Sequence, residues 1–177
     1  MTTTHPIQIG SVRRDLPVRE VAPGIRVALF NVLGDWELTE ALGFALAKLV
    51  PTGTDMFIMP DGKAQSLLHV LGRVTSLPTI VARKEHKPYM RAPVLSVRVK
   101  SITTDRVQEL HLGDDDVQRL AGRRVAIVDD VVSTGGTLDA MRQLLDQARA
   151  IHAGTLAAFT EGEPRNDVIS LGHLPLY

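Results

Sequence analysis

The stretch VAIVDDVVSTGGT, residues 125–137, constrains the fold of this chain more than any other segment. The residues from Val125 to Val128 form an apolar run that is typical of a buried strand. Asp129 and Asp130 follow where that strand is expected to end, and a loop of small residues then leads into a helical pattern. Ligands of parallel α/β sheets bind beyond the carboxyl ends of the strands. The order of these features therefore predicts a binding site.

The rest of the chain alternates short apolar runs with amphipathic helical patterns. Strands are expected at 25–33, 56–60, 78–83, 124–129, 154–160 and 167–171. Helices are expected at 36–49, 65–73 and 136–149, with a short helical turn at 114–122. This alternation predicts an α/β fold with a mostly parallel sheet and helices on both of its faces.

Two segments fall outside this alternation. Residues 94–112 alternate apolar and polar side chains in two runs, which predicts a half-exposed β-hairpin. Residues 1–34 are interrupted by Pro6, Pro17 and a Pro-Gly pair at 23–24. We expect this segment to be mostly irregular, with the strand at 25–33 as its only regular part.

The composition argues against several classes of protein. The 177 residues fit one domain, and 20 basic residues balance 20 acidic ones, which argues against a nucleic-acid partner. The absence of cysteine excludes disulfides and thiolate metal sites. No stretch approaches the roughly 20 apolar residues that span a bilayer, and the N-terminus lacks a signal-peptide pattern. We therefore expect a cytoplasmic protein with no membrane contact.

The loop of small residues after the two acids has the chemistry of a phosphate site. It opens a helix, and helix N-termini attract anions through their free N–H groups and the aligned dipole. Gly135 and Gly136 allow the backbone to approach an anion closely. Further donors are the hydroxyl groups of Ser133, Thr134 and Thr137.

The two acids suit a different part of a ligand. Carboxylates accept hydrogen bonds, so Asp129 and Asp130 match the hydroxyls of a sugar or the waters of a divalent cation. A phosphate cradle beside two such acceptors describes a ribose 5-phosphate site. A Walker loop would need a Lys after Gly136, the dinucleotide glycine pattern is absent, and a receiver-type phospho-acceptor does not need the cradle. An isolated DD or STGG more often only caps a helix, whereas the complete string favours a site.

The complete string resembles the signature of type I phosphoribosyltransferases: four apolar residues, two acids, two apolar residues and a small-Thr-Gly-Gly-Thr loop. The similarity is greatest to adenine and xanthine members and their uncharacterised relatives. The resemblance implies a Rossmann-like sheet, a flexible β-hairpin over the site, and a small hood from residues 1–34 and about 160–177 of a single domain. It also implies a nucleobase, a homodimer, and phosphoribosyl pyrophosphate held with Mg²⁺, for which either Asp129 or Asp130 could be a ligand.

Arg83, Lys84 and Lys87 lie near the carboxyl end of the strand at 78–83. Cations at this position would stabilise both bound pyrophosphate and the departing group. Adenine-type members carry a similar Arg-Lys followed by a Lys. The resemblance therefore implies that these residues bind substrate, although Lys84 could also face solvent.

The turn at 61–64 occupies the place where the family binds pyrophosphate with backbone amides. Gly62 would permit a close approach, and Lys63 would add positive charge. Lys63 and Ala64 depart from the adenine pattern, which typically has an acid, a small residue, Arg, Gly and an aromatic residue.

The hairpin departs from the adenine pattern as well. An ungapped match places Thr103 where adenine members carry a Glu credited with proton transfer, and a threonine holds its proton too tightly to act as a base. Asp105 or Glu109 could substitute, or could equally be exposed strand residues. The reaction is expected to pass through an oxocarbenium-like transition state. The resemblance thus implies that the catalytic residues Asp129 and Asp130 act by positioning and electrostatics.

The nucleobase is the least determined part of the site. Phe30 and Leu33 could supply an apolar face, whereas Phe159 is expected in the core. Polar contacts could come from residues 160–168, and the six histidines show no metal-ligand spacing.

Two functions follow. The first is a purine phosphoribosyltransferase of the adenine or xanthine type. The alternative is a non-catalytic sensor that binds phosphoribosyl pyrophosphate or a nucleotide, which the altered turn and Thr103 favour. A DNA-binding regulator would be expected to carry a basic helix-turn-helix extension, and none is visible in this sequence.

Overall fold

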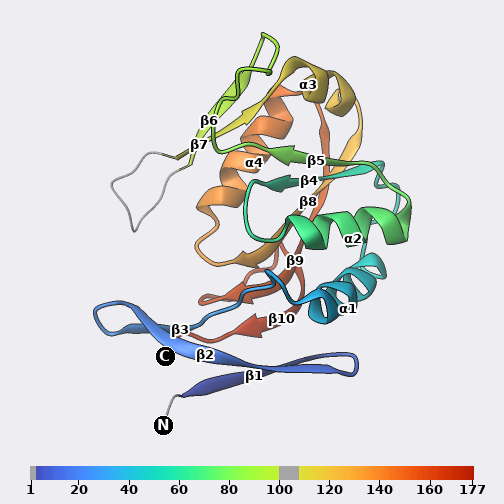
Figure 1. The fold of residues 1–177 in the computed structure, drawn as a ribbon. Helices are drawn as coiled ribbons and strands as arrows, with labels where there is room; N and C mark the ends of the chain where they lie inside the picture. Colours follow the sequence, from blue (N-terminus) through green and yellow to red (C-terminus); the bar gives the residue numbers. More distant parts are fainter. Residues whose placement is uncertain (1–2, 100–107) are drawn as a thin grey trace.

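The computed structural model describes residues 3–99 and 108–177 (Figure 1). Its central sheet has five parallel strands in the order β10-β9-β8-β4-β5. Their bounds are β4 (Met56–Pro60), β5 (Thr79–Ala82), β8 (Arg124–Val132), β9 (Ile151–Glu161) and β10 (Ile169–Leu174). The predicted parallel α/β fold is therefore confirmed.

Helices cover both faces of this sheet. Their bounds are α1 (Trp36–Ala47), α2 (Gln65–Thr75), α3 (Asp114–Leu120) and α4 (Gly136–Gln147). Alternate residues of β8 enter two separate apolar cores: Ala126 and Val128 pack with α1 and α2, while Val125 and Ile127 pack with α4. Because both faces are buried, each central strand is a continuous apolar run.

Strand β8 is longer than predicted. The sequence pattern ended the strand at Asp129, but pairing with β9 continues to Val132, which lies opposite Thr160. Asp129 and Asp130 therefore lie inside the last part of the strand. The backbone ladder with β9 holds them there, and no local sequence signal reports such pairing.

The expectation of irregular structure in residues 1–34 is wrong. This segment forms an antiparallel sheet of β1 (Thr4–Ile9), β2 (Val12–Ala22) and β3 (Ile25–Ala28), which we call the hood sheet. Two-residue connections, Gly10-Ser11 and Pro23-Gly24, join its strands, as in tight hairpins.

The prolines misled the sequence analysis because their positions in the sheet are tolerant. Pro6 lies in β1, an edge strand, where a missing N–H need not break a ladder, and Pro17 lies in β2 just before Val18, the residue at which the pairing with β3 ends. The informative signal was instead the alternation of buried residues such as Ile7, Ile9 and Leu16 with exposed neighbours.

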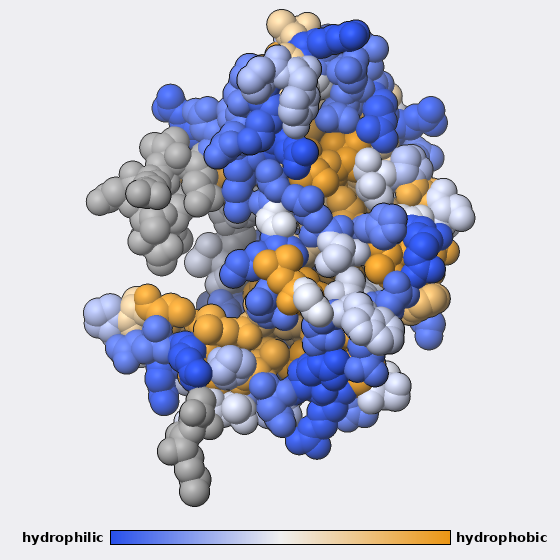
Figure 2. Space-filling model, in the orientation of Figure 1, coloured by the Kyte–Doolittle hydropathy of each residue, from blue (hydrophilic) through white to orange (hydrophobic). Residues whose placement is uncertain are grey.

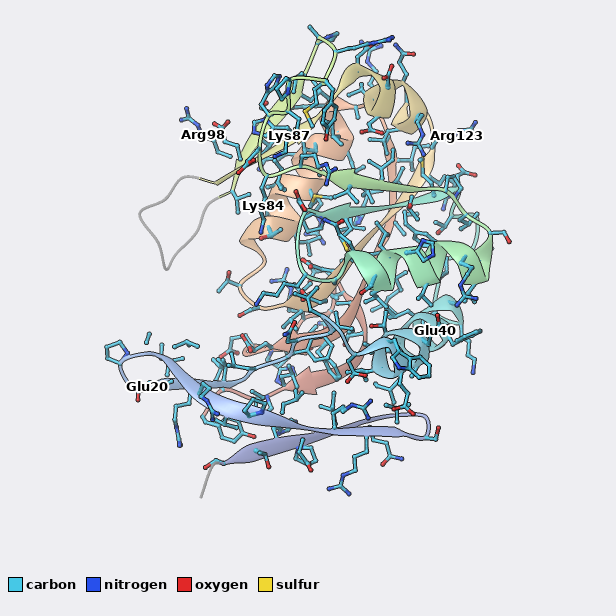
Figure 3. The ribbon with its side chains drawn as sticks, viewed as in Figure 1. Glu20, Glu40, Lys84, Lys87, Arg98 and Arg123 are labelled. Atoms are coloured by element: carbon cyan, nitrogen blue, oxygen red, sulfur yellow. The ribbon has the colours of Figure 1, made fainter. Side chains whose placement is uncertain are left out.

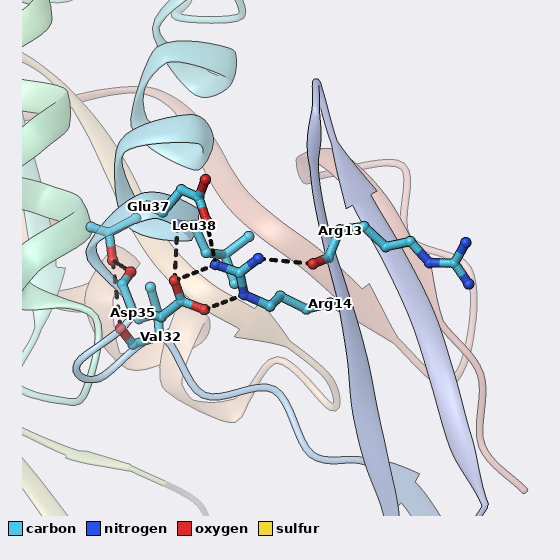
Figure 4. Close-up of polar contacts among 7 residues, drawn as sticks. Arg13, Arg14, Val32, Asp35, Glu37 and Leu38 are labelled. Atoms are coloured by element: carbon cyan, nitrogen blue, oxygen red, sulfur yellow. Dashed lines mark hydrogen bonds and ion pairs between the residues drawn. The ribbon is translucent and has the colours of Figure 1, made fainter.

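Polar contacts join the hood sheet to the rest of the chain at the C-terminus and at the start of α1. At the C-terminus, Arg26 and Tyr177 exchange backbone hydrogen bonds of 3.1 and 2.9 Å, so residues 176–177 extend the hood while β10 belongs to the central sheet. At the start of α1, Arg14 of β2 binds Asp35 through Nε at 2.7 Å and Glu37 through Nη2 at 2.8 Å (Figure 4). Asp35 also caps α1 by accepting from the Leu38 N–H at 3.1 Å.

The predicted hairpin is present as β6 (Leu95–Val99) and β7 (Gln108–Leu112), which pair antiparallel. It is joined to the segment after β5 by two backbone hydrogen bonds between Arg83 and His111, of 3.0 and 2.7 Å. Thr103 and Asp105 lie outside the described residues, and Glu109 lies in β7.

Candidate functional site

Two carboxyl groups lie side by side near the end of β8. Oδ1 of Asp129 accepts the backbone N–H of Asp130 at 2.9 Å, and Oδ1 of Asp130 accepts the N–H of Val131 at 2.8 Å. Burial, followed by the adjacent charge of Asp130, raises the pKa of Asp129 to about 8. A cation or hydroxyl donor placed here would meet acceptor groups that are held by their own backbone.

The loop after β8 turns directly into α4. Gly135 caps the helix with a φ of 87°, a left-handed conformation that favours glycine. A cavity of about 140 Å³ opens against this loop. It is lined by Asp129 and by the run of residues 131–138, which contains every predicted phosphate-binding residue.

A second cavity of about 290 Å³ adjoins the first. Its lining comes from the turn after β4, from Lys84 after β5, and from β8 and α4. Asp129, Val131 and Thr137 line both cavities. A ligand with two anionic groups could therefore occupy both cavities while passing the two carboxylates.

The turn at 61–64 places positive charge in the lining of the second cavity. Gly62, Lys63 and Lys84 all line it together with Asp129 and Asp130. Gly62 has no left-handed φ, and a Cβ there would make only an ordinary contact of 3.7 Å with the Pro60 carbonyl. Its position in the cavity, and not a special backbone conformation, is what this glycine contributes.

The other two predicted cations lie elsewhere. Arg83 is 3.7 Å from Asp61 and 3.5 Å from the Tyr89 hydroxyl, and Lys87 pairs with Glu85 (Figure 3 labels Lys84 and Lys87). Neither Arg83 nor Lys87 lines the two cavities described above. Of the three cations after β5, the structure brings Lys84 to the carboxylates.

Sequence reasoning missed two residues that hydrogen-bond to the loop at 133–137, the predicted phosphate loop, without lining either cavity. Arg165 donates through Nη1 to the carbonyl groups of Thr134 at 3.3 Å and Ser133 at 3.5 Å. The Ser133 hydroxyl hydrogen-bonds the carboxylate of Glu161, whose pKa is raised because it is partly buried. A serine hydroxyl carries one proton, so Ser133 cannot donate to a ligand while it donates to Glu161. The only feature of the sequence that pointed to Glu161 and Arg165 was the polar character of the segment 160–168.

Two of the candidate base-binding residues are adjacent. The rings of Phe30 and Phe159 are 5.0 Å apart in an edge-to-face arrangement, and Phe159 is buried as expected. Leu33 is 58% exposed. Figure 2 shows further apolar side chains gathered along the part of this face that the hood sheet occupies, next to a hollow.

The side chains of the site can coordinate a divalent cation only together with oxygen atoms of a bound ligand. Among residues 3–99 and 108–177, no group of three or more His, Cys, Asp or Glu side chains could hold a metal ion. Asp129 and Asp130 supply carboxylate oxygens, which Mg²⁺ favours, and this ion commonly takes one or two carboxylates plus substrate phosphates. The site therefore fits an Mg²⁺ ion that arrives with a phosphorylated ligand.

Comparisons with known proteins agree with this geometry. Residues 76–170 match the phosphoribosyl transferase domain. An adenine phosphoribosyltransferase of Rhodococcus opacus is 33% identical over 129 residues, which cover 72% of this chain and 70% of that protein. The purine biosynthesis transcriptional repressor PurR of Bacillus subtilis is 26% identical over 135 residues, which cover 76% of this chain and 46% of the repressor.

Among solved structures, adenine phosphoribosyltransferase from Thermoanaerobacter pseudethanolicus superposes with a TM-score of 0.68 at 21% identity, covering 97% of this chain and 95% of that one. In the described part of this chain, no helix has the length and apolar character needed to cross a bilayer. The matched domain contains Lys84, β8, the loop at 133–137 and α4, which line the two joined cavities, whereas the lining residues 59–64 of the second cavity lie before it. On the domain match and the similarity to the Rhodococcus enzyme, the chain belongs to the phosphoribosyltransferase family.

Proposed function

We propose that this chain is a purine phosphoribosyltransferase of the adenine or xanthine type. It would transfer ribose 5-phosphate from phosphoribosyl pyrophosphate to a free purine, giving the nucleoside monophosphate and pyrophosphate. The observation that carries the proposal is the pair of adjoining cavities with Asp129 and Thr137 in both linings. One cavity suits a 5-phosphate and the other a pyrophosphate, with the sugar between them.

Each part of the site has a task in this reaction. The loop at 133–137 binds the 5-phosphate through backbone N–H groups at the start of α4, and the two carboxylates of β8 hold the sugar hydroxyls. Lys63 and Lys84 face the pyrophosphate. Mg²⁺, when bound with the substrate near Asp129 and Asp130, would offset negative charge on the departing pyrophosphate.

The base would lie between the phosphate loop and the hood. Leu33 and the partly buried Phe30 offer apolar surface at this end of the site, and a flat purine ring is suited to such a surface. Positive charge develops on the sugar as the pyrophosphate departs. The carboxylates of Asp129 and Asp130 stabilise it, so catalysis rests mainly on electrostatics and positioning.

A panel of bases tests the proposal. Adenine, hypoxanthine, guanine, xanthine and a pyrimidine are each assayed with phosphoribosyl pyrophosphate and Mg²⁺, and release of pyrophosphate is measured. We expect turnover with at least one purine. Failure with every base would contradict the enzymatic proposal.

A second candidate is a regulatory protein that binds phosphoribosyl pyrophosphate or a nucleotide without turnover. It is favoured by the similarity to PurR and by the departure of the 61–64 turn from the adenine pattern. Calorimetry with phosphoribosyl pyrophosphate, run beside the activity panel, separates the two candidates. Binding without turnover would support the regulator.

A cytoplasmic homodimer remains a prediction from the family resemblance. Sedimentation of the full chain measures its mass directly, and a monomer at micromolar concentration would contradict the dimer.

A further inference from the structure

Arg165 packs against the phosphate loop and hydrogen-bonds to its backbone. It follows β9, and its guanidinium reaches the carbonyl groups of Ser133 and Thr134 at 3.5 and 3.3 Å. A Cβ on Gly135 would fall 2.4 Å from Nη1 of Arg165. Arg165 lines neither of the two cavities described above, so it contacts the loop outside the proposed ligand space.

The guanidinium is itself held by other charged groups. Asp167 accepts from Nε of Arg165 at 3.1 Å and from Nη2 at 2.8 Å, which is a bidentate pair. Asp167 also accepts from Arg142 of α4 at 2.8 Å. The Arg165 side chain is only 19% exposed. The loop, the start of β10 and α4 are thus joined by one network.

This arrangement matters because a glycine loop can turn its peptide groups over at little cost. Gly135 has access to both signs of φ, so the peptide between Thr134 and Gly135 can present either its N–H or its carbonyl to the cavity. A carbonyl facing the cavity would repel a phosphate, whereas an N–H would bind it. Hydrogen bonds from a charged donor to the carbonyls of Ser133 and Thr134 favour the binding orientation.

We propose that Arg165, held by Asp167 and Arg142, is a positioning residue that keeps the carbonyl groups of the phosphate loop turned outward so that its N–H groups face the sugar phosphate. This inference rests on the proposed function, because it assumes that the loop binds a phosphate. According to this inference, phosphate affinity depends on a residue in the segment after β9, which lies outside the signature at 125–137.

The test compares Arg165→Ala and Arg165→Lys with a matched control, Arg119→Ala. Arg119 also pairs with an Asp, at 3.1 Å, and donates to a backbone carbonyl, that of Thr79 at 3.3 Å, but does so from α3. Binding of ribose 5-phosphate and of phosphoribosyl pyrophosphate with Mg²⁺ is measured by calorimetry on the full chain. KM for each substrate, kcat and the melting temperature are measured in parallel.

We expect Arg165→Ala to weaken ribose 5-phosphate binding by about tenfold or more, since charged hydrogen bonds of the anchor are lost. KM for phosphoribosyl pyrophosphate should rise while KM for the base stays near its original value. Arg165→Lys, which keeps one charged donor, should recover part of the affinity. Arg119→Ala should leave both affinities unchanged.

The inference is overturned if Arg165→Ala or Arg165→Lys binds ribose 5-phosphate as well as the original chain does. It is also overturned if Arg165→Ala weakens binding of the base as much as binding of the sugar phosphate, because equal losses would mean that the substitution disturbs the whole site and not the phosphate loop specifically. If the original chain binds phosphoribosyl pyrophosphate without turnover, the enzymatic proposal alone fails, and the binding measurements still decide the role of Arg165. If the original chain binds neither sugar ligand, both proposals fail together.

Discussion

The two sides of the candidate site are held in different ways. On the side proposed to bind the 5-phosphate, Gly135 adopts a left-handed conformation, and Arg165 and Glu161 hydrogen-bond to the loop outside the cavities. On the pyrophosphate side, Gly62 has ordinary geometry, and Lys63 contributes charge from an exposed turn. Under the proposed function, the first side would bind its ligand through a fixed backbone shape and the second through charge. Only a shape that requires particular residues leaves a recognisable sequence signature.

The largest effect is expected at the junction of the two sides. Asp129→Asn and Asp130→Asn keep the side-chain size but cannot ionise, whereas bound Mg²⁺ and the positive charge developing on the sugar would favour the ionised carboxyl groups despite the raised pKa of Asp129. Each substitution should lower kcat/KM by roughly a hundredfold or more. The melting temperature should fall little, because the raised pKa of Asp129 shows that its charge is not stabilised by the fold. Turnover close to that of the original chain would refute the assigned role of either residue.

Matched glycine substitutions test the contrast directly. Gly135→Ala should reduce sugar-phosphate affinity by about tenfold or more, because the new Cβ meets Arg165 and requires a strained positive φ. Gly62→Ala should change affinity less than about threefold, since its Cβ finds only the Pro60 carbonyl at 3.7 Å. Calorimetry with ribose 5-phosphate and with pyrophosphate measures both. Equal losses of affinity in Gly135→Ala and Gly62→Ala would show that backbone shape matters no more on one side than on the other.

Lysine substitutions examine the charge side. Lys63→Ala and Lys84→Ala should each raise KM for phosphoribosyl pyrophosphate by roughly two- to fivefold, as expected for partly solvated ion pairs. The effect should shrink as salt is added, because salt screens such pairs. Lys48→Ala on the exposed end of α1 is the control. A salt-independent loss would indicate that the lysines act through shape.

The junction between hood and core should affect stability more than sugar-phosphate affinity. Asp35→Ala removes both the cap of α1 and the pairing with Arg14, and should lower the free energy of unfolding by about 1 kcal/mol from the cap alone. Arg14→Ala should lower the melting temperature less, because the cap remains. Denaturant unfolding and ribose 5-phosphate binding are compared for both variants. An affinity loss as large as that of Gly135→Ala would contradict this division.

The smallest effect is a pH dependence from the Arg165 network. Hydrogen bonds from Arg165 and then Arg142 lower the pKa of Asp167 to about 2. A lowered pKa stabilises the fold above the unfolded pKa, and this contribution disappears as pH falls from about 4 towards 2. Asp167 is 40% exposed, so solvent screening keeps the contribution below about 1 kcal/mol. Asp167→Asn should therefore lose less stability than the original chain over that pH interval. Identical acid unfolding curves would show that the pair contributes nothing.

Local sequence patterns predicted most of the central sheet and the helices on its faces. The apolar runs of β4, β8 and β9 and the periodicity of α1 and α4 are local properties, so their positions could be read with errors only at the ends. The strands β1 and β2 of the hood were missed because Pro6 and Pro17 were interpreted as breaks, without knowing that Pro6 lies in an edge strand and Pro17 beside the end of the β2–β3 pairing. The length of β8 beyond Asp129 depended on its partner strand in the same way.

The sequence by itself determined the parallel α/β core and the chemistry of the 125–137 segment, because both depend on residues that are neighbours in the chain. Only the tertiary structure decided that Lys84, and neither Arg83 nor Lys87, faces the carboxylates, and that Arg165 binds the loop 31 residues before it. The physical reason is that such contacts arise where separate segments pack together. The packing of the sheet sets the distance and direction of these contacts, and local sequence patterns cannot predict them.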